Sequence, residues 1–149
     1  MIQALDRSEI EELLRSSTFA RIGCHADGET YVVPVAYVYD VPHRRLVLQS
    51  KHGKKIEMMR SNPDVCVEVD DPGDLLTWRS AILWGRFEEL HGTAALEALA
   101  MLVDRFEPLF EAARADSLTP PRLRHEPERD VVFAIQIDRI TGRWEDGAH

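Results

Sequence analysis

The chain has 149 residues, of which 44% are hydrophobic, and a formal net charge of −8. We therefore expect one domain, residues 1–149, that buries its core without disulfides or a structural metal. The acidic balance argues against a nucleic-acid partner, because neutralising phosphates requires a basic face. Neither a membrane-length apolar run nor a signal-peptide pattern is seen, so we expect a cytoplasmic protein that does not enter a membrane.

A short amphipathic helix is predicted near the amino end. Asp6 and Glu9 have the spacing of a capping box, in which each residue satisfies a backbone N–H of the other. Apolar residues then recur at helical spacing, and the pattern ends near Ser16.

The next segment predicts a β-hairpin. Strands at Phe19–Cys24 and Thr30–Tyr39 flank an Asp27-Gly28 pair, which suits the positive backbone angles of a tight turn. The second strand is apolar on both faces, as in a barrel wall that another element or subunit covers. Pro34 cannot donate a ladder hydrogen bond, so it marks an edge or a bulge.

The rest of the chain alternates strands with helices. The predicted strands are Leu46–Ser50, Val65–Val69, Trp78–Leu90 and Val131–Ile137. The predicted helices are Ile56–Arg60, Thr93–Glu107 and a short one near Leu109–Ala115 in a loop-rich stretch bounded by prolines. The apolar side of the helix Thr93–Glu107 is expected to carry Leu96, Leu99, Ala100, Val103 and Phe106. Some six strands with such helices predict an α+β, mainly β protein built on a small barrel.

One basic segment stands out in this acidic chain. The chain has only three lysines, and Lys51, Lys54 and Lys55 fall within five consecutive positions, where a strand gives way to a helix. First-turn amides and ammonium groups favour an anion there, while Gly53 permits close approach and the Ser50 hydroxyl can donate. A phosphate is the natural ligand. A merely solvated charged turn is the alternative.

Two tryptophans are candidates for covering the rest of a ligand. Trp78 opens one predicted strand and Trp144 follows another, so either side chain could stack on an aromatic ring or belong to the core. The histidines have no metal-ligand spacing, and no nucleophile–base pattern appears. We expect no metal site, and the catalytic residues are unknown.

Several motifs, taken in order, resemble those of a known family. They are Val33-Pro34-Val35-Ala36-Tyr37-Val38-Tyr39, Gly53-Lys54-Lys55, Asn62-Pro63-Asp64-Val65-Cys66 and Trp78-Arg79-Ser80-Ala81 through Leu90. The chain is similar over nearly its whole length to the pyridoxamine 5′-phosphate oxidase-like flavin-nucleotide-binding proteins, in the branch of the nitroimidazole-resistance proteins.

The resemblance implies a six-stranded split β-barrel with flanking helices that forms a homodimer, with FMN at the subunit interface. It implies that Lys54 and Lys55 hold the FMN phosphate beside Ser50, and that the strand Val33–Val35 runs along the flavin ring. It further implies that Arg79 and Ser80 approach the flavin and that Trp144 of the partner reaches the ring.

Three functions remain open from the sequence. The first is an FMN-dependent oxidoreductase that passes electrons from a reduced nicotinamide donor to a small electron-poor acceptor. The second is a flavin-binding module without turnover, acting as a store or a sensor. The third keeps the fold but binds deazaflavin F420 or haem.

Overall fold

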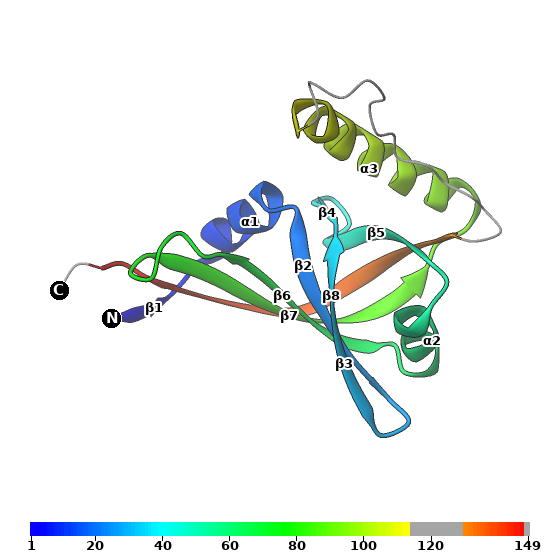
Figure 1. Ribbon diagram of the computed structural model, residues 1–149, viewed down its shortest axis with the longest axis horizontal. Helices are drawn as coiled ribbons and strands as arrows, with labels where there is room; N and C mark the ends of the chain where they lie inside the picture. The colour runs from blue at the N-terminus through cyan, green and yellow to red at the C-terminus, as the bar shows by residue number, and fades with distance from the viewer. Residues whose placement is uncertain (114–129, 148–149) are drawn as a thin grey trace.

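The computed structural model describes residues 1–113 and 130–147. Within them, one antiparallel sheet of eight strands has the order β3-β2-β6-β7-β8-β5-β4, and β1 pairs with β8 (Figure 1). The strands are β1 Ile2–Ala4, β2 Phe19–Ala26, β3 Glu29–Ala36, β4 Val38–Asp40, β5 Arg45–Lys51, β6 Asp64–Asp71, β7 Trp78–Glu89 and β8 Asp130–Glu145. The helices are α1 Arg7–Ser16, α2 Lys54–Ser61 and α3 Gly92–Ala113.

The predicted first helix is confirmed, capping box included. The Asp6 carboxylate accepts a 2.8 Å hydrogen bond from the Glu9 amide, and the Glu9 carboxylate accepts one of 2.8 Å from the Asp6 amide. Buried side chains on one face of α1 then pack against the sheet: Ile10, Leu13 and Leu14.

The predicted hairpin forms, but its second strand is divided. Asp27 and Gly28 have φ angles of 52° and 78°, as the two-residue turn requires. The strand expected to reach Tyr39 ends at Ala36, because the Tyr37 amide donates to Thr18 instead and the chain then crosses to pair with β5. β3 and β4 are thus opposite ends of the sheet order, separated only by Tyr37.

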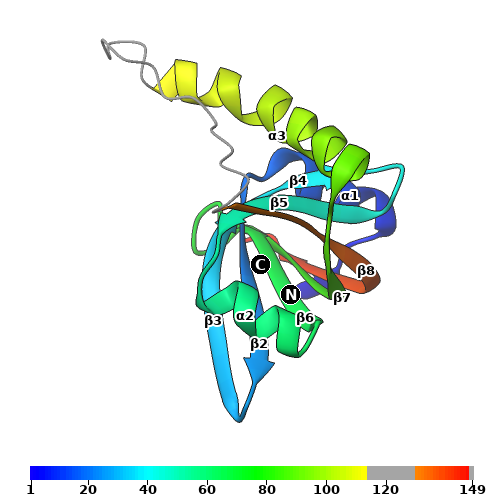
Figure 2. The same cartoon turned by 90° about the vertical axis from the view of Figure 1, so that its right-hand side faces the viewer.

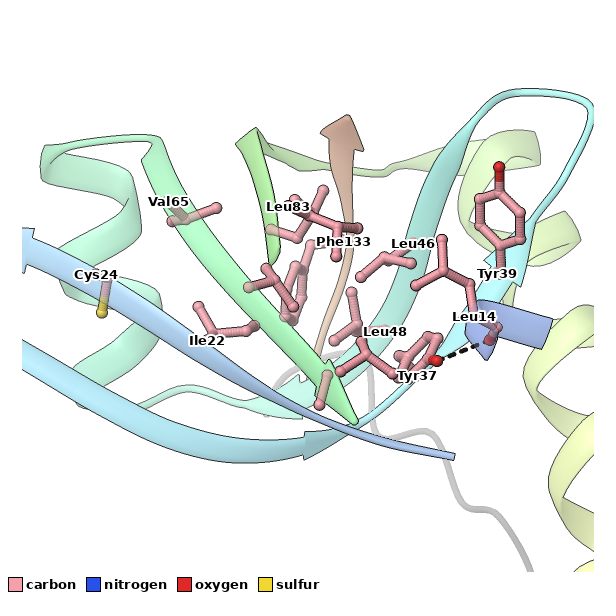
Figure 3. Packing of buried hydrophobic residues seen from close by; sticks show 14 of the residues in the cluster. Leu14, Ile22, Cys24, Tyr37, Tyr39, Leu46, Leu48, Val65, Leu83 and Phe133 are labelled. Atoms are coloured by element: carbon pink, nitrogen blue, oxygen red, sulfur yellow. Dashed lines mark hydrogen bonds between the residues drawn. The ribbon is translucent and has the colours of Figure 1, made fainter. Parts of the chain in front are cut away.

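This crossing makes the sheet curl around one core. Large side chains from both halves meet inside it, among them Ile22, Tyr37, Leu48, Leu83 and Phe133 (Figure 3). The six longer strands form the barrel wall, so the mainly β prediction is confirmed, and β1 and β4 are three-residue additions to it. Burial of apolar surface on this scale is the main stabilising contribution.

β8 is the longest strand and links the two ends of the barrel. It pairs with β5 and β7 in its first half and with β7 and β1 in its second. The register shifts next to Gly85, where a side-chain Cβ would collide with the Gln136 carbonyl oxygen. A glycine is needed there because the two backbones approach so closely at the bulge.

α3 lies outside the barrel over β4 and β5 (Figure 2). The predicted end of this helix was wrong, because the helix continues through Pro108 to Ala113. Its predicted apolar side was correct only in part: Phe106 faces the sheet together with Ala98 and Leu102, whereas Leu96 is 68% exposed and Ala100 is exposed. Packing of aromatic side chains on both sides of Pro108 outweighs the hydrogen bond that the proline removes.

The remainder of the proline-bounded stretch, including Pro120, Pro121 and Pro127, lies outside the described residues. In the part of the chain that is described, no helix combines the length and the apolar character needed to cross a membrane.

Candidate functional site

The lysine segment lies at a strand-to-helix junction, as predicted. β5 ends at Lys51 and α2 begins at Lys54, with Gly53 as the N-cap residue. No side chain caps the helix, so its first-turn amides remain available to an anion. A Cβ placed on Gly53 would meet nothing within 4 Å, so the space beside this N-cap residue is open.

The two helix lysines have different surroundings. Lys54 is exposed, forms an ion pair with Glu29, and places its Nζ 4.9 Å from the centre of the Tyr31 ring. The hydrogen bond that the Lys54 ammonium donates to the Glu29 carboxylate raises the pKa of Lys54 above its usual value. Lys55 is half-buried, and this burial lowers the pKa of its ammonium group.

Among the described residues no carboxylate pairs with Lys55. A partly desolvated ammonium without a counter-ion is unfavourable by itself, so an anion that reaches it gains more than it would from an exposed lysine. Ser50, the hydroxyl predicted beside it, is half-buried and donates to the Lys51 carbonyl at 3.0 Å.

β3, the strand predicted to run along a flavin ring, lies beside α2. Lys54 contacts Glu29 and Tyr31 at its start, and α2 packs on the β2–β3 hairpin (Figure 2). Val33 and Val35 face the core, whereas Pro34 points outward. Since β3 ends the sheet order, its outer edge has no strand partner among the described residues, which agrees with the edge position predicted for Pro34.

The other predicted site residues form a second group. Trp144 on β8 lies opposite Arg79 on β7, and the Trp78 indole donates to the Glu145 carboxylate at 3.2 Å. Arg79 is held by Glu12 and Asp71, and Ser80 is its half-buried neighbour on β7. Trp144 packs partly against the core, so this chain alone gives it a structural role.

One chain does not bring the two groups together. Ser50 pairs with Val131 near the start of β8, whereas Arg79 pairs with Trp144 near its end (Figure 1). The strand between them is roughly 40 Å long at about 3.3 Å per residue. A single mononucleotide held at the lysines would therefore not reach Trp144 of the same chain.

Four partners of the site residues carry no local signal in the sequence. They are Glu29 and Tyr31, which contact Lys54, and Glu12 and Asp71, which hold Arg79. Glu29 and Tyr31 are more than twenty positions from the lysine that they contact, so no pattern within one element indicates the pairing.

Comparison with known families agrees with this geometry. The sequence model of the pyridoxamine 5′-phosphate oxidase family matches residues 6–144. The chain belongs to this family. Family membership and the observed mainly β sheet together confirm the split-barrel fold implied by the sequence motifs.

Solved structures show the same fold. A FAD-binding protein of Mesorhizobium loti is 32% identical, with 98% of this chain and 99% of that one covered and a TM-score of 0.73. A candidate 5-nitroimidazole antibiotic resistance protein of Bacteroides thetaiotaomicron is 20% identical, with 97% and 87% covered and a TM-score of 0.72. A FAD- and haem-binding protein of Mycobacterium smegmatis is 22% identical, with 95% and 72% covered and a TM-score of 0.72.

Proposed function

We propose that the chain is an FMN-dependent oxidoreductase that passes electrons from a reduced nicotinamide donor to a small electron-poor acceptor in the cytoplasm. The observation that carries the proposal is the half-buried Lys55 ammonium, which has no carboxylate partner among the described residues and stands at the uncapped start of α2. This arrangement fits a phosphate group, because helix amides and ammonium groups both stabilise one.

Each group of the junction has a separate task in this proposal. Lys55 and the first-turn amides of α2 bind the phosphate. Lys54 leaves its ion pair with Glu29 and binds the phosphate instead. Ser50 and Lys51 lie next to the phosphate. The open edge of β3 at Val33–Val35 orients the ring. Bound flavin would supply the redox chemistry, while the chain supplies position and electrostatics.

A homodimer would complete the site. The second group, with Trp78, Arg79, Ser80 and Trp144, lies too far along β8 to serve the same flavin within one chain. A second copy that packs on the outer face of β3 would bring its own Trp144 to the ring. Val32 on that face is 63% exposed, as expected of a surface that another chain covers.

FAD is a second candidate cofactor, because the 32% identical Mesorhizobium protein is described as binding FAD. Both nucleotides carry a phosphate that suits the junction. The absorption spectrum of purified protein separates flavin from F420 and haem, and the mass of the released cofactor separates FMN from FAD.

Substitutions at the junction test the phosphate site. Lys55→Ala should weaken FMN binding at least about tenfold, because removing one partner of a partly buried charge pair typically costs about 2 kcal/mol or more. Lys54→Ala should have a smaller effect, since that side chain is exposed and already paired. Glu29→Gln should strengthen binding, because it removes the carboxylate that competes for Lys54. Titration calorimetry measures all three.

An FMN affinity that is unchanged in Lys55→Ala would mean that the phosphate binds elsewhere.

Turnover is a separate test: reconstituted protein should oxidise a nicotinamide donor with at least one of a panel of quinones and nitro compounds. Tight FMN binding without any turnover would contradict the oxidoreductase and favour a flavin store or sensor.

A further inference from the structure

A cavity between α3 and the barrel belongs to neither group of predicted site residues. Its volume is about 290 Å³, and it lies where the second half of α3 extends beyond β5, over the start of β2 and the end of β3. Its apolar wall is made of Phe19, Ala36, Leu102, Phe106, Leu109 and Phe110.

The lining indicates an uncharged ligand. Among the described residues, no charged side chain lines the cavity, and the polar side chains that line it are Thr18 and Gln49. The Gln49 amide donates to the Asp130 carboxylate at 3.0 Å. An ion would lose its hydration here without gaining an oppositely charged partner among the described residues, whereas a neutral apolar molecule would gain contacts with the apolar wall.

The geometry of the wall favours a flat ligand. The rings of Phe106 and Phe110 are nearly parallel, with an interplanar angle of 25° and centroids 6.3 Å apart. Aromatic molecules pack well on such faces through offset or tilted stacking. The volume lies at the lower limit of ordinary ligand sites, about 300 Å³, so the ligand is small.

Apolar side chains are also left in water at the mouth of the cavity. Phe19 is 61% exposed and Leu109 is 38% exposed, although both could be covered by a molecule in the cavity. We infer that this cavity binds a small, neutral, planar aromatic molecule. This binding goes beyond the proposed flavin site and does not require flavin.

The position of the cavity relates it to the proposed reaction. Ala36 directly follows the Val33–Val35 segment on β3, and Gln49 directly precedes Ser50 on β5. The cavity therefore adjoins both segments proposed to hold FMN. The ligands inferred for the cavity are small neutral aromatic molecules, and this class includes small aromatic acceptors of the proposed oxidoreductase.

The test uses N-phenyl-1-naphthylamine, a neutral apolar probe that fluoresces in apolar sites. The full chain should bind one probe per chain, with and without saturating FMN, by fluorescence and by calorimetry. Ala36→Leu narrows the cavity and Leu109→Asp places a charge at its mouth, so each should weaken binding at least about tenfold.

Two matched controls carry the same changes on the exposed side of α3. Ala100→Leu and Leu96→Asp should leave probe binding unchanged, because both side chains point away from the cavity. The four substituted residues are all exposed in the wild-type protein: Ala36, Leu96, Ala100 and Leu109. Thermal unfolding, followed by circular dichroism, verifies that each variant folds.

Three results would overturn the inference. They are no saturable binding to the full chain, equal affinity in the cavity variants and their controls, and displacement of the probe by FMN. A cavity filled by another part of the chain or by a second copy would produce the first result. If FMN does not bind but the probe does, the proposed function fails and the cavity site stands.

Discussion

Lys55 is the residue on which the proposed phosphate site depends most. Its half-buried ammonium is less stable in the charged form than that of an exposed lysine, so its pKa is lowered by burial. A bound phosphate stabilises the charged form and offsets this cost. The protein therefore attracts the phosphate most strongly when Lys55 is protonated.

FMN affinity should consequently fall as the pH rises through the lowered pKa of Lys55, below the ordinary lysine value of about 10.4. Dissociation constants measured from pH 7 upward test this. Lys55→Arg should remove the decline in this range, because arginine stays protonated. The same decline in wild type and in Lys55→Arg would exclude Lys55 as its source.

Asp40 and Arg45 form a buried ion pair at the β4–β5 turn, with 2.9 Å between Arg45 Nε and Asp40 Oδ2. Burial alone would raise the pKa of Asp40, but hydrogen bonds from Arg45 and then His43 outweigh it and hold the pKa below its usual range. Because the folded-state pKa is depressed, this stability is present above the unfolded value of about 3.9 and is lost as the pH falls through the folded pKa.

Asp40→Ala should lower the free energy of unfolding by about 3 kcal/mol at pH 7, because it leaves the Arg45 guanidinium buried without its partner. Urea denaturation measures the change. Asp138→Ala is the matched control: its ion pair with Arg86 is exposed and should contribute less than about 1 kcal/mol. Equal effects in the two variants would contradict the importance of burial.

At the scale of elements, Tyr37 ties α1 to the point where the barrel closes. Its hydroxyl donates to the Leu14 carbonyl at 2.7 Å, in the last turns of α1, and its ring is fully buried (Figure 3). The same residue separates β3 from β4, so one side chain holds a helix against the crossing. Burial also raises the pKa of this hydroxyl, which keeps it a donor across the ordinary pH range.

Tyr37→Phe should destabilise the fold by about 1–2 kcal/mol, since the buried Leu14 carbonyl loses its side-chain donor. Thermal and urea unfolding measure the loss. Tyr39→Phe is the control, because no hydrogen bond of the Tyr39 hydroxyl is found in the described part of the chain. If the two variants lose the same stability, the Tyr37 hydrogen bond is not the cause.

At the scale of the whole molecule, the outer face of the β3–β2–β6 sheet is the surface at which we propose that the homodimer forms. Val32 lies across β2 from Cys66, with only Gly23 between them, and Pro34 is exposed beside Val32. An ion pair between the exposed Arg21 and the half-buried Asp70 continues the same face. Neighbouring exposed apolar side chains bordered by polar ones are typical of a surface that another molecule covers.

Val32→Glu should therefore dissociate the proposed homodimer, because it buries a carboxylate among apolar side chains. Sedimentation velocity over a range of concentrations measures the shift to monomer. Val41→Glu, at a 43% exposed valine in the β4–β5 turn, should leave the dimer intact. A wild-type protein that is monomeric at every concentration would contradict the dimer.

Local patterns predicted most elements correctly because their causes are local. The Asp6–Glu9 capping box and the Asp27-Gly28 turn depend on residues within a few positions of each other. The predictions of element bounds were wrong where contacts with residues distant in the sequence determine the structure. Tyr37 divides a continuous apolar run, and Pro108 stays inside α3, because contacts with other elements outweigh the local preference.

For the candidate site, the sequence by itself determined the basic junction at which we propose that an anion binds, since Lys51, Gly53, Lys54 and Lys55 are close neighbours in the chain however it folds. Only the tertiary structure decided how the lysines differ. Lys54 forms an ion pair with Glu29, whereas Lys55 is half-buried and has no carboxylate partner among the described residues. The tertiary structure also separated Trp144 from the lysines by the length of β8. Burial and long-range pairing depend on how the sheet curls, and no spacing in the sequence records that.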